Sequence, residues 1–302
     1  MGTENSHAQG IVEYLNADGA GAGARVVALA GGPTRRNQDL ARLGAIPRIV
    51  EEPEQLMGSI DALILATRDG RLHRQQALPF LRAGVPVWID KPLACSRADA
   101  SDILDAASAA RTHATSSSAL RWTPDALELL RAREGVGELQ TVTLIGPADA
   151  RSPYGGIFFY GVHVADVARM LAPGPAGEVS VQRVAQTIRV QYRTAGPLVT
   201  LDLVEPPGDG RTPFWATLVG RRGVESRELR LGEGYVRPGV DVFLRMLSTG
   251  CAPLTREEML DPISVLEQVA AVIGDVAPRA GTTDAGGEPG AVPALARLKA
   301  DG

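Results

Sequence analysis

The residues Asp61-Ala-Leu-Ile-Leu-Ala-Thr67 and Trp88-Ile-Asp-Lys-Pro-Leu93 each form a short apolar run that ends in polar side chains. A helical pattern, His73 to Ala83, lies between them and stops at Gly84. Short buried strands that alternate with helices pair in parallel through right-handed crossovers. The carboxyl ends of both strands should then meet at one edge of the sheet, where open α/β sheets bind ligands.

The same alternation of strands and helices extends on both sides of this stretch. The strand that contains Trp88 is predicted at 85–89. Further strands are predicted at 25–30 and 112–119, and further helices at 36–43 and 97–111. We therefore expect residues 1–122 to form a Rossmann-like domain, a doubly wound parallel sheet with helices on both faces.

After residue 123 the pattern changes to strands separated by short turns. Candidate strands lie at 138–145, 179–192, 198–204, 214–220 and 225–231, and candidate helices at 125–132, 161–171, 241–248 and 262–276. Consecutive strands with short turns pair antiparallel. Residues 123–277 are therefore predicted to form an α+β domain with a mostly antiparallel sheet, and the Gly-, Ala- and Pro-rich residues 278–302 a flexible tail.

The composition excludes several classes of function. Of the 302 residues 44% are hydrophobic, and no apolar run approaches the roughly 18 residues that cross a bilayer. The net charge is −4 and there is no basic block, which argues against nucleic-acid binding. The start has no signal-peptide pattern, and neither the two cysteines, Cys95 and Cys251, nor the four histidines have metal-site spacing. We expect a cytoplasmic protein without a metal, acting on a small molecule.

Lys91 is one of only two lysines, the other being Lys299. It follows the predicted strand 85–89, and Pro92 keeps it out of helical geometry. A lysine at the mouth of a strand can donate a proton to a substrate oxygen. The alternative is a surface lysine at the end of a strand.

The motif Asp90-Lys91-Pro92 resembles the Glu-Lys-Pro signature of the family of glucose-fructose oxidoreductase, inositol dehydrogenase and MocA proteins (Gfo/Idh/MocA), with Asp in place of Glu. Residues 73–77, 120–124 and 243–250 resemble further family segments. The resemblance implies an oxidoreductase that uses NAD or NADP on a hydroxyl or carbonyl of a sugar-like molecule, a cyclitol or a specialised metabolite. It also implies a homodimer or homotetramer formed through the exposed face of the second sheet.

The family's second-domain helix carries an Asp and, four residues later, a His that contacts substrate. His163 matches this His, but Phe159 occupies the position of the Asp, and Tyr160 offers a hydroxyl instead. The candidate catalytic residues are thus Lys91, His163 and Tyr160. The candidate substrate-binding residues are Arg121, Trp122, Tyr154 and Phe159. Aromatic rings packed at the seam between the domains are the alternative interpretation of Tyr154 and Tyr160.

The cofactor end of the sequence departs from the family. Members begin with a strand that runs into G-x-G-x-x-G, whereas this chain has no first strand, matches the first glycine with Gly2, and has Glu4 and His7 at the other two positions. A carboxylate at the second position opposes the pyrophosphate by its bulk and charge. The acid that binds the ribose is absent as well. The candidate cofactor contacts are Gly2, Arg35, Arg36, Thr67 and Asp90, and the two arginines favour NADP unless they are solvated residues at a helix start.

Three functions remain open at this point. The first is a nicotinamide-dependent oxidoreductase in which Lys91 and His163 protonate or polarise the reacting oxygen. The second is a redox-inactive member of the family that catalyses a lyase, cyclase or isomerase step by acid-base chemistry, as Glu4 and Phe159 suggest. The third is a non-catalytic binding or regulatory protein. The gap left by the first strand requires either a start upstream, another segment in its place, or a remodelled cofactor domain.

Overall fold

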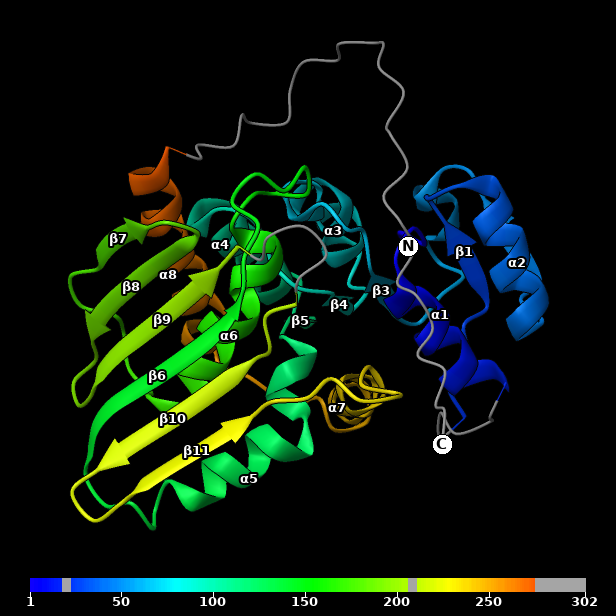
Figure 1. Cartoon of the computed structure of the whole chain (residues 1–302). Helices are drawn as coiled ribbons and strands as arrows, with labels where there is room; N and C mark the ends of the chain where they lie inside the picture. Colours follow the sequence, from blue (N-terminus) through cyan, green and yellow to red (C-terminus); the bar gives the residue numbers. More distant parts are fainter. Residues whose placement is uncertain (18–22, 206–210, 275–302) are drawn as a thin grey trace, which may run out of the picture.

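The computed structural model describes residues 1–17, 23–205 and 211–274. Two units lie next to each other, a large six-stranded sheet with its helices and a smaller α/β unit that contains the N-terminus (Figure 1). The predicted tail, residues 278–302, lies outside the described residues. In the part of the chain that is described, no helix is long and apolar enough to cross a membrane.

The N-terminal unit has the predicted parallel sheet, in two hydrogen-bonded sets. One set pairs β1 with β2, and the other has the order β3-β4-β5; all pairs are parallel. The Rossmann-like prediction is thereby confirmed, although the sequence analysis missed β2. The elements are α1 (Ser6–Val12), β1 (Ala28–Ala30), α2 (Thr34–Gly44), β2 (Arg48–Val50), β3 (Leu63–Leu65), α3 (His73–Arg82), β4 (Val87–Ile89), α4 (Arg97–Ala109) and β5 (Ala114–Thr115).

Met1 and Gly2 occupy the gap between β1 and β3. The Met1 ammonium donates to the Ile64 carbonyl at 2.7 Å, and the Met1 carbonyl accepts from the Ala66 N–H at 2.7 Å. On the other side the Gly2 N–H donates to the Ala30 carbonyl at 3.0 Å. These two residues therefore link the two sets of strands.

A cavity of about 460 Å³ opens beside Met1 between the two sets of strands. Its walls include the apolar side chains of Ile11, Leu15, Leu63 and Phe243. Burial in these surroundings lowers the pKa of the Met1 amine from 8.0 to about 6, and the negative charge of Glu4 opposes that shift only in part. A charged amine thus stands where the interior of the sheet would favour an amide.

The second unit is a six-stranded sheet with the order β11-β10-β6-β9-β8-β7. Only β6 and β9 pair in parallel, so the prediction of a mostly antiparallel sheet is confirmed. The single strand predicted at 179–192 is wrong: it is a hairpin that turns at Ala185, whose φ is +52°. The strands are β6 (Leu139–Pro147), β7 (Ser180–Val184), β8 (Thr187–Arg193), β9 (Leu198–Val204), β10 (Trp215–Gly220) and β11 (Val224–Glu228).

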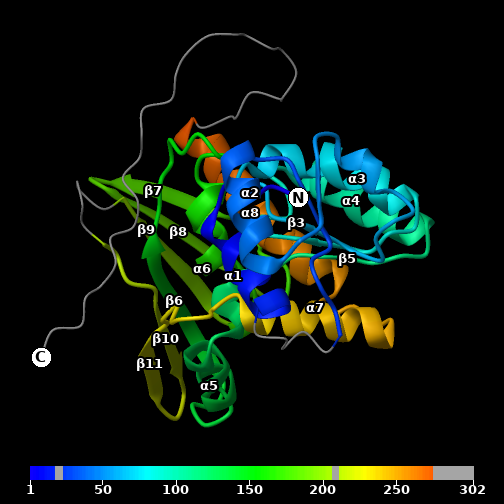
Figure 2. The ribbon, with the colours of Figure 1, turned by 90° about the vertical axis from the view of Figure 1, so that its right-hand side faces the viewer.

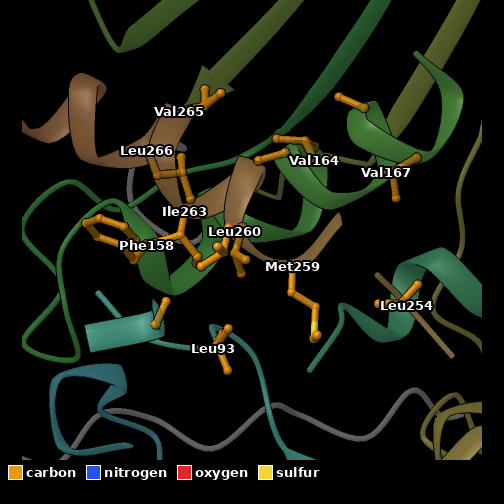
Figure 3. Packing of buried hydrophobic residues seen from close by; sticks show 14 of the residues in the cluster. Leu93, Phe158, Val164, Val167, Leu254, Met259, Leu260, Ile263, Val265 and Leu266 are labelled. Atoms are coloured by element: carbon orange, nitrogen blue, oxygen red, sulfur yellow. The ribbon is translucent and has the colours of Figure 1, made fainter. Parts of the chain in front are cut away.

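Three helices cover one face of this sheet: α5 (Pro124–Ala132), α6 (Phe158–Leu171) and α8 (Arg256–Ile273) (Figure 2). α6 and α8 pack tightly against each other, with Ile263 and Leu266 of α8 beside Phe158 of α6 (Figure 3). Residues of β8 alternate between buried and exposed, as expected for a sheet with one covered face. α6, which carries His163, is therefore held rigidly between the sheet and α8.

One helix that follows the six-stranded sheet in the sequence packs back on the N-terminal unit. α7 (Arg237–Thr249) packs its apolar side against α1 and β4, where Val240 and Phe243 join Ile11 and Trp88 in one buried cluster. A domain boundary after residue 122 stays a prediction, but α7 lies beyond that boundary and contributes to the core of the first unit.

Candidate active site

Lys91 lies directly after β4, at the carboxyl edge of the parallel sheet. Its ammonium donates to the Phe159 carbonyl at 3.3 Å and stands 4.5 Å from the centre of the Phe159 ring. Only 8% of the residue is exposed. Burial lowers the pKa of Lys91 below its usual 10.5; the charge of Asp90 opposes this shift and that of Arg68 adds to it. The ammonium is therefore a stronger proton donor than a lysine in water.

Phe159 has a clear role in the structure, although it replaces an acid of the family pattern. Its ring provides a face to which a buried cation is attracted. It also contacts Tyr160 edge-on at 4.8 Å and Tyr154 at 5.3 Å between ring centres. The aromatic residues predicted at the seam are thus in contact with one another, and Phe159 joins them to Lys91.

His163 lies one turn after Phe159 on α6, on the same side of the helix. Its Nδ1 is 2.6 Å from the Ser118 hydroxyl, and the ring meets Phe214 edge-on. Burial lowers the pKa of His163 well below 6.5, and the positive charges of Lys91 and His7 lower it further. The imidazole is therefore neutral at neutral pH, and it shares one buried environment with Lys91.

His7 and Asp90 form an ion pair that the sequence analysis did not foresee. His7 Nδ1, in the first turn of α1, lies 2.7 Å from Asp90 Oδ2 at the end of β4. Burial by itself raises the pKa of Asp90, but the charge and hydrogen bond of His7 and the charge of Lys91 outweigh it and hold the pKa at about 2. Asp90, predicted to contact a cofactor, is thus the partner of His7. The sequence contained one signal for this pair, because the start of a helix and the end of a strand in this fold both lie at the carboxyl edge of the parallel sheet.

The turn before α1 fits tightly against the end of β3. Gly2 has a φ of +78°, and a Cβ on it would lie 2.3 Å from the Thr67 backbone nitrogen, so glycine is required there. The Glu4 carboxylate accepts from the Arg68 N–H at 2.7 Å, and the Arg68 guanidinium lies 5.0 Å from the centre of the Tyr154 ring. Gly2 and Thr67, both predicted cofactor contacts, are therefore neighbours.

The two candidate arginines of α2 differ in their surroundings. Arg35 is exposed, whereas Arg36 is half-buried and donates to the Gln9 side chain at 3.1 Å and to the Thr3 carbonyl at 3.4 Å. Of the other candidates, Tyr160 is 39% exposed at the start of α6. Trp122 donates from its indole to Ser117 at 2.9 Å.

Arg121 is nearly fully buried in an ion-pair network, not free in the cleft. Its guanidinium lies 2.8 Å from an oxygen of Asp166 on α6 and 2.8 Å from one of Glu258 on α8. Asp166 also accepts from the Ser118 N–H at 2.7 Å, and Ser118 in turn holds His163. The network therefore orients the imidazole from behind, and the predicted contact of Arg121 with substrate stays a prediction that this geometry does not favour.

The described residues contain no group of three or more His, Cys, Asp or Glu side chains that could hold a metal ion. The ionisable groups gathered at the sheet edge are an ammonium, a neutral imidazole and a His–Asp pair. Such a set can donate a proton to an oxygen and accept one from a neighbouring atom.

Residues 2–116 match the model of the oxidoreductase family with an NAD-binding Rossmann fold, Gfo/Idh/MocA. The N-terminal unit of the chain is therefore similar to this family. No curated protein matches the sequence.

Solved structures show the same fold as this chain over nearly its whole length. The scyllo-inositol dehydrogenase of Lactobacillus casei is 12% identical, with a TM-score of 0.75 over 89% of this chain and 96% of that one. An oxidoreductase of Agrobacterium radiobacter, in complex with NAD+, L-tartaric acid and magnesium, is 16% identical, with a TM-score of 0.74 over 90% and 95%. GenD2 from gentamicin A biosynthesis, in complex with NAD, is 16% identical, with a TM-score of 0.73 over 88% and 91%.

The Arg121 network should contribute strongly to the stability of the folded chain. Arg121→Met leaves the buried Asp166 carboxylate without its partner, and we expect a loss of about 3–5 kcal/mol in the free energy of unfolding, measured with urea. The control is Arg189→Met, which breaks an exposed pair with Asp202 and should change stability by less than about 1 kcal/mol. Equal losses in the two variants would contradict the role given to Arg121.

Proposed function

We propose that this chain is an enzyme that carries out acid-base catalysis on a sugar-like molecule, a cyclitol or a specialised metabolite that carries a hydroxyl or carbonyl group. The observation that carries the proposal is the shared burial of Lys91 and His163, two groups from different units of the fold. Burying a cation and an imidazole together is unfavourable for folding, so their joint placement points to function. The match of residues 2–116 to a family of oxidoreductases supports this assignment.

In this proposal Lys91 donates its proton, or a charge-assisted hydrogen bond, to the substrate oxygen. The neutral imidazole of His163 accepts a proton from the substrate. Tyr160, exposed near Phe159, offers its hydroxyl at the entrance, and Tyr154 lines the approach beside Arg68. With a carbonyl substrate, the C–H electron pair next to the carbonyl becomes the C=C bond of an enol, and the oxygen takes the Lys91 proton; no electron leaves the substrate.

A nicotinamide dinucleotide is the cofactor with which this family carries out oxidoreduction, and when bound it exchanges a hydride with the substrate carbon. Gly2 fits its fingerprint, because its φ and its contact with Thr67 allow no side chain. Glu4 does not fit: its carboxylate stands in the turn that a pyrophosphate approaches. After β1 the chain has Gly31-Gly32-Pro33 where a ribose acid is expected. The residues as they stand therefore do not fit NAD or NADP, and the geometry favours a lyase, cyclase or isomerase step.

The second candidate is an NAD- or NADP-dependent dehydrogenase. It is supported by the family match over residues 2–116 and by the solved structures of this fold that contain NAD. Arg36, half-buried beside the turn, is the residue that would favour NADP. The two candidates share Lys91 and His163, and they differ in whether turnover requires an added nicotinamide.

Replacing Lys91 tests both candidates. Lys91→Met should reduce turnover of hydroxy- and keto-cyclitols, followed by NMR with and without NAD+ and NADP+, by roughly 10²–10⁴-fold, since it removes the proton donor. Lys299→Met, at the chain's other lysine, is the control and should keep full activity. A Lys91→Met variant that remains folded and fully active would end the proposal.

The pH dependence gives a second test of the same site. The pKa of Lys91 is lowered below 10.5, so activity should fall on the alkaline side before that pH. The pKa of His163 is lowered below 6.5, so the fall on the acid side should come well below that pH. Both limbs are read from the pH profile of turnover, and an acid limb at or above pH 6.5 would contradict the assignment of His163 as the neutral base.

We further propose that the chain forms a homodimer or homotetramer through the open face of the six-stranded sheet. The support is that the described helices lie on its other face (Figure 2), while Trp215 is 38% exposed on the open one. Trp215→Glu should reduce the mass measured by light scattering, whereas Val272→Glu, at an exposed position of α8, should leave it unchanged. A monomeric wild-type protein would contradict this proposal.

A further inference from the structure

We infer that the crevice in which this fold holds a dinucleotide is closed in this chain by its own side chains, Glu4 and His7, so that the reaction at Lys91 is redox-neutral. The inference rests on the proposed function and narrows it to one class of chemistry. Three side chains of the turn before α1 and of its first turn carry it, because each bridges the crevice to the end of β3 or β4. They are Glu4, Asn5 and His7.

The first bridge places a negative charge in the turn. The Glu4 carboxylate accepts from the Arg68 N–H at 2.7 Å, and the Arg68 guanidinium approaches the Glu4 carbonyl at 3.4 Å. A pyrophosphate at this turn would carry charge of the same sign and would need the same donors. The carboxylate is thus an internal substitute for an anionic ligand, attached at the position where the family has a glycine.

The second bridge, from His7 to Asp90, lies at the end of β4 next to Lys91. A hydride donor has to come within about 3.5 Å of a substrate carbon held by Lys91, and its ring must therefore lie beside the end of β4. His7 already lies there, 2.7 Å from Asp90, and Tyr235 supports its ring edge-on at 5.3 Å between ring centres. Asp90 is ionised and half-buried, so separating the pair would leave a partly desolvated charge without its partner.

The third bridge fixes the turn between the other two. Asn5 donates from its side chain to the Ala66 carbonyl at 2.5 Å, and its side-chain oxygen caps α1 at the Ala8 N–H, 3.1 Å away. One side chain thus holds both the start of the helix and the end of β3. Because Asn5 holds this segment in place, the backbone of Glu4 and of His7 cannot move unless α1 moves as well.

The ribose end of the crevice is also occupied. The Thr3 hydroxyl donates to Asn37 at 2.5 Å, and it lies 2.3 Å from where a Cβ on Gly32 would be. Arg36 is engaged by Thr3 and Gln9. Of the two arginines predicted to meet a phosphate, Arg36 is thus engaged within the protein, whereas Arg35 is exposed. Residues 31–38, directly after β1, contain no carboxylate to bind the ribose hydroxyls.

The test is a titration of the full chain with NAD+, NADH, NADP+ and NADPH by calorimetry. We expect no binding to the wild type at millimolar cofactor. The double variant Glu4→Gly/His7→Gly restores the spacing G-x-G-x-x-G and opens both bridges, and it should bind at least one of the four at least tenfold more tightly. The matched control is Glu54→Gly/His113→Gly, which removes the same two residue types outside the crevice and should bind none.

Two results would overturn the inference: wild-type protein that binds a nicotinamide cofactor as tightly as the double variant, or a double variant that has a cooperative melting transition and still binds none. If the double variant does not fold, Glu4→Gln decides in its place, because it removes only the negative charge and should still give a several-fold gain. Nicotinamide binding by a wild type that Lys91→Met inactivates would end the inference and leave the proposed function intact; no binding together with a fully active Lys91→Met would do the opposite.

Discussion

The contact between the Lys91 ammonium and Phe159 is the interaction on which the organisation of the site depends. It joins the end of β4 in the parallel sheet to the first turn of α6 in the other unit. A buried ammonium needs a carbonyl oxygen, a negative charge or an aromatic face nearby, and this one has all three, from Phe159 and Asp90. α6, which the sheet and α8 hold in place, carries His163 one turn after Phe159. A proton donor and a neutral imidazole are thereby brought to one place from opposite sides of a seam.

Behind the His163 imidazole, the charged groups of Arg121, Asp166 and Glu258 pair with one another and support the ring. Arg121 binds Asp166 and Glu258 and so ties a short turn between the units to α6 and α8. Because Asp166 also fixes the Ser118 backbone, the hydroxyl that holds His163 cannot move independently of the helix. Because the pair of Arg121 with Asp166 is deeply buried, breaking it costs much free energy, and the pair therefore holds the His163 ring in one orientation.

The turn before α1 keeps the backbone conformation of the Rossmann fingerprint at Gly2 but carries side chains at Glu4 and His7. Gly2 retains the conformation and close approach that the Rossmann fingerprint requires, so the backbone follows the family's path. Glu4 and His7 add side chains where the family has hydrogen atoms, and both bond to the ends of neighbouring strands. The glycines of such a fingerprint serve two purposes, chain geometry and space for a ligand, and Gly2 serves the first of them.

The sequence by itself determined the doubly wound fold, the mostly antiparallel second sheet and the position of Lys91 at the mouth of a strand, because apolar periodicity and strand ends are local properties of the chain. It also identified Glu4 and Phe159 as departures from the family. Tertiary structure decided the rest: the seat of Met1 between β1 and β3, the pairing of His7 with Asp90, and the engagement of Arg121 by Asp166 and Glu258. Each of these joins residues at least 28 positions apart, and no local pattern shows which distant charge a side chain will meet.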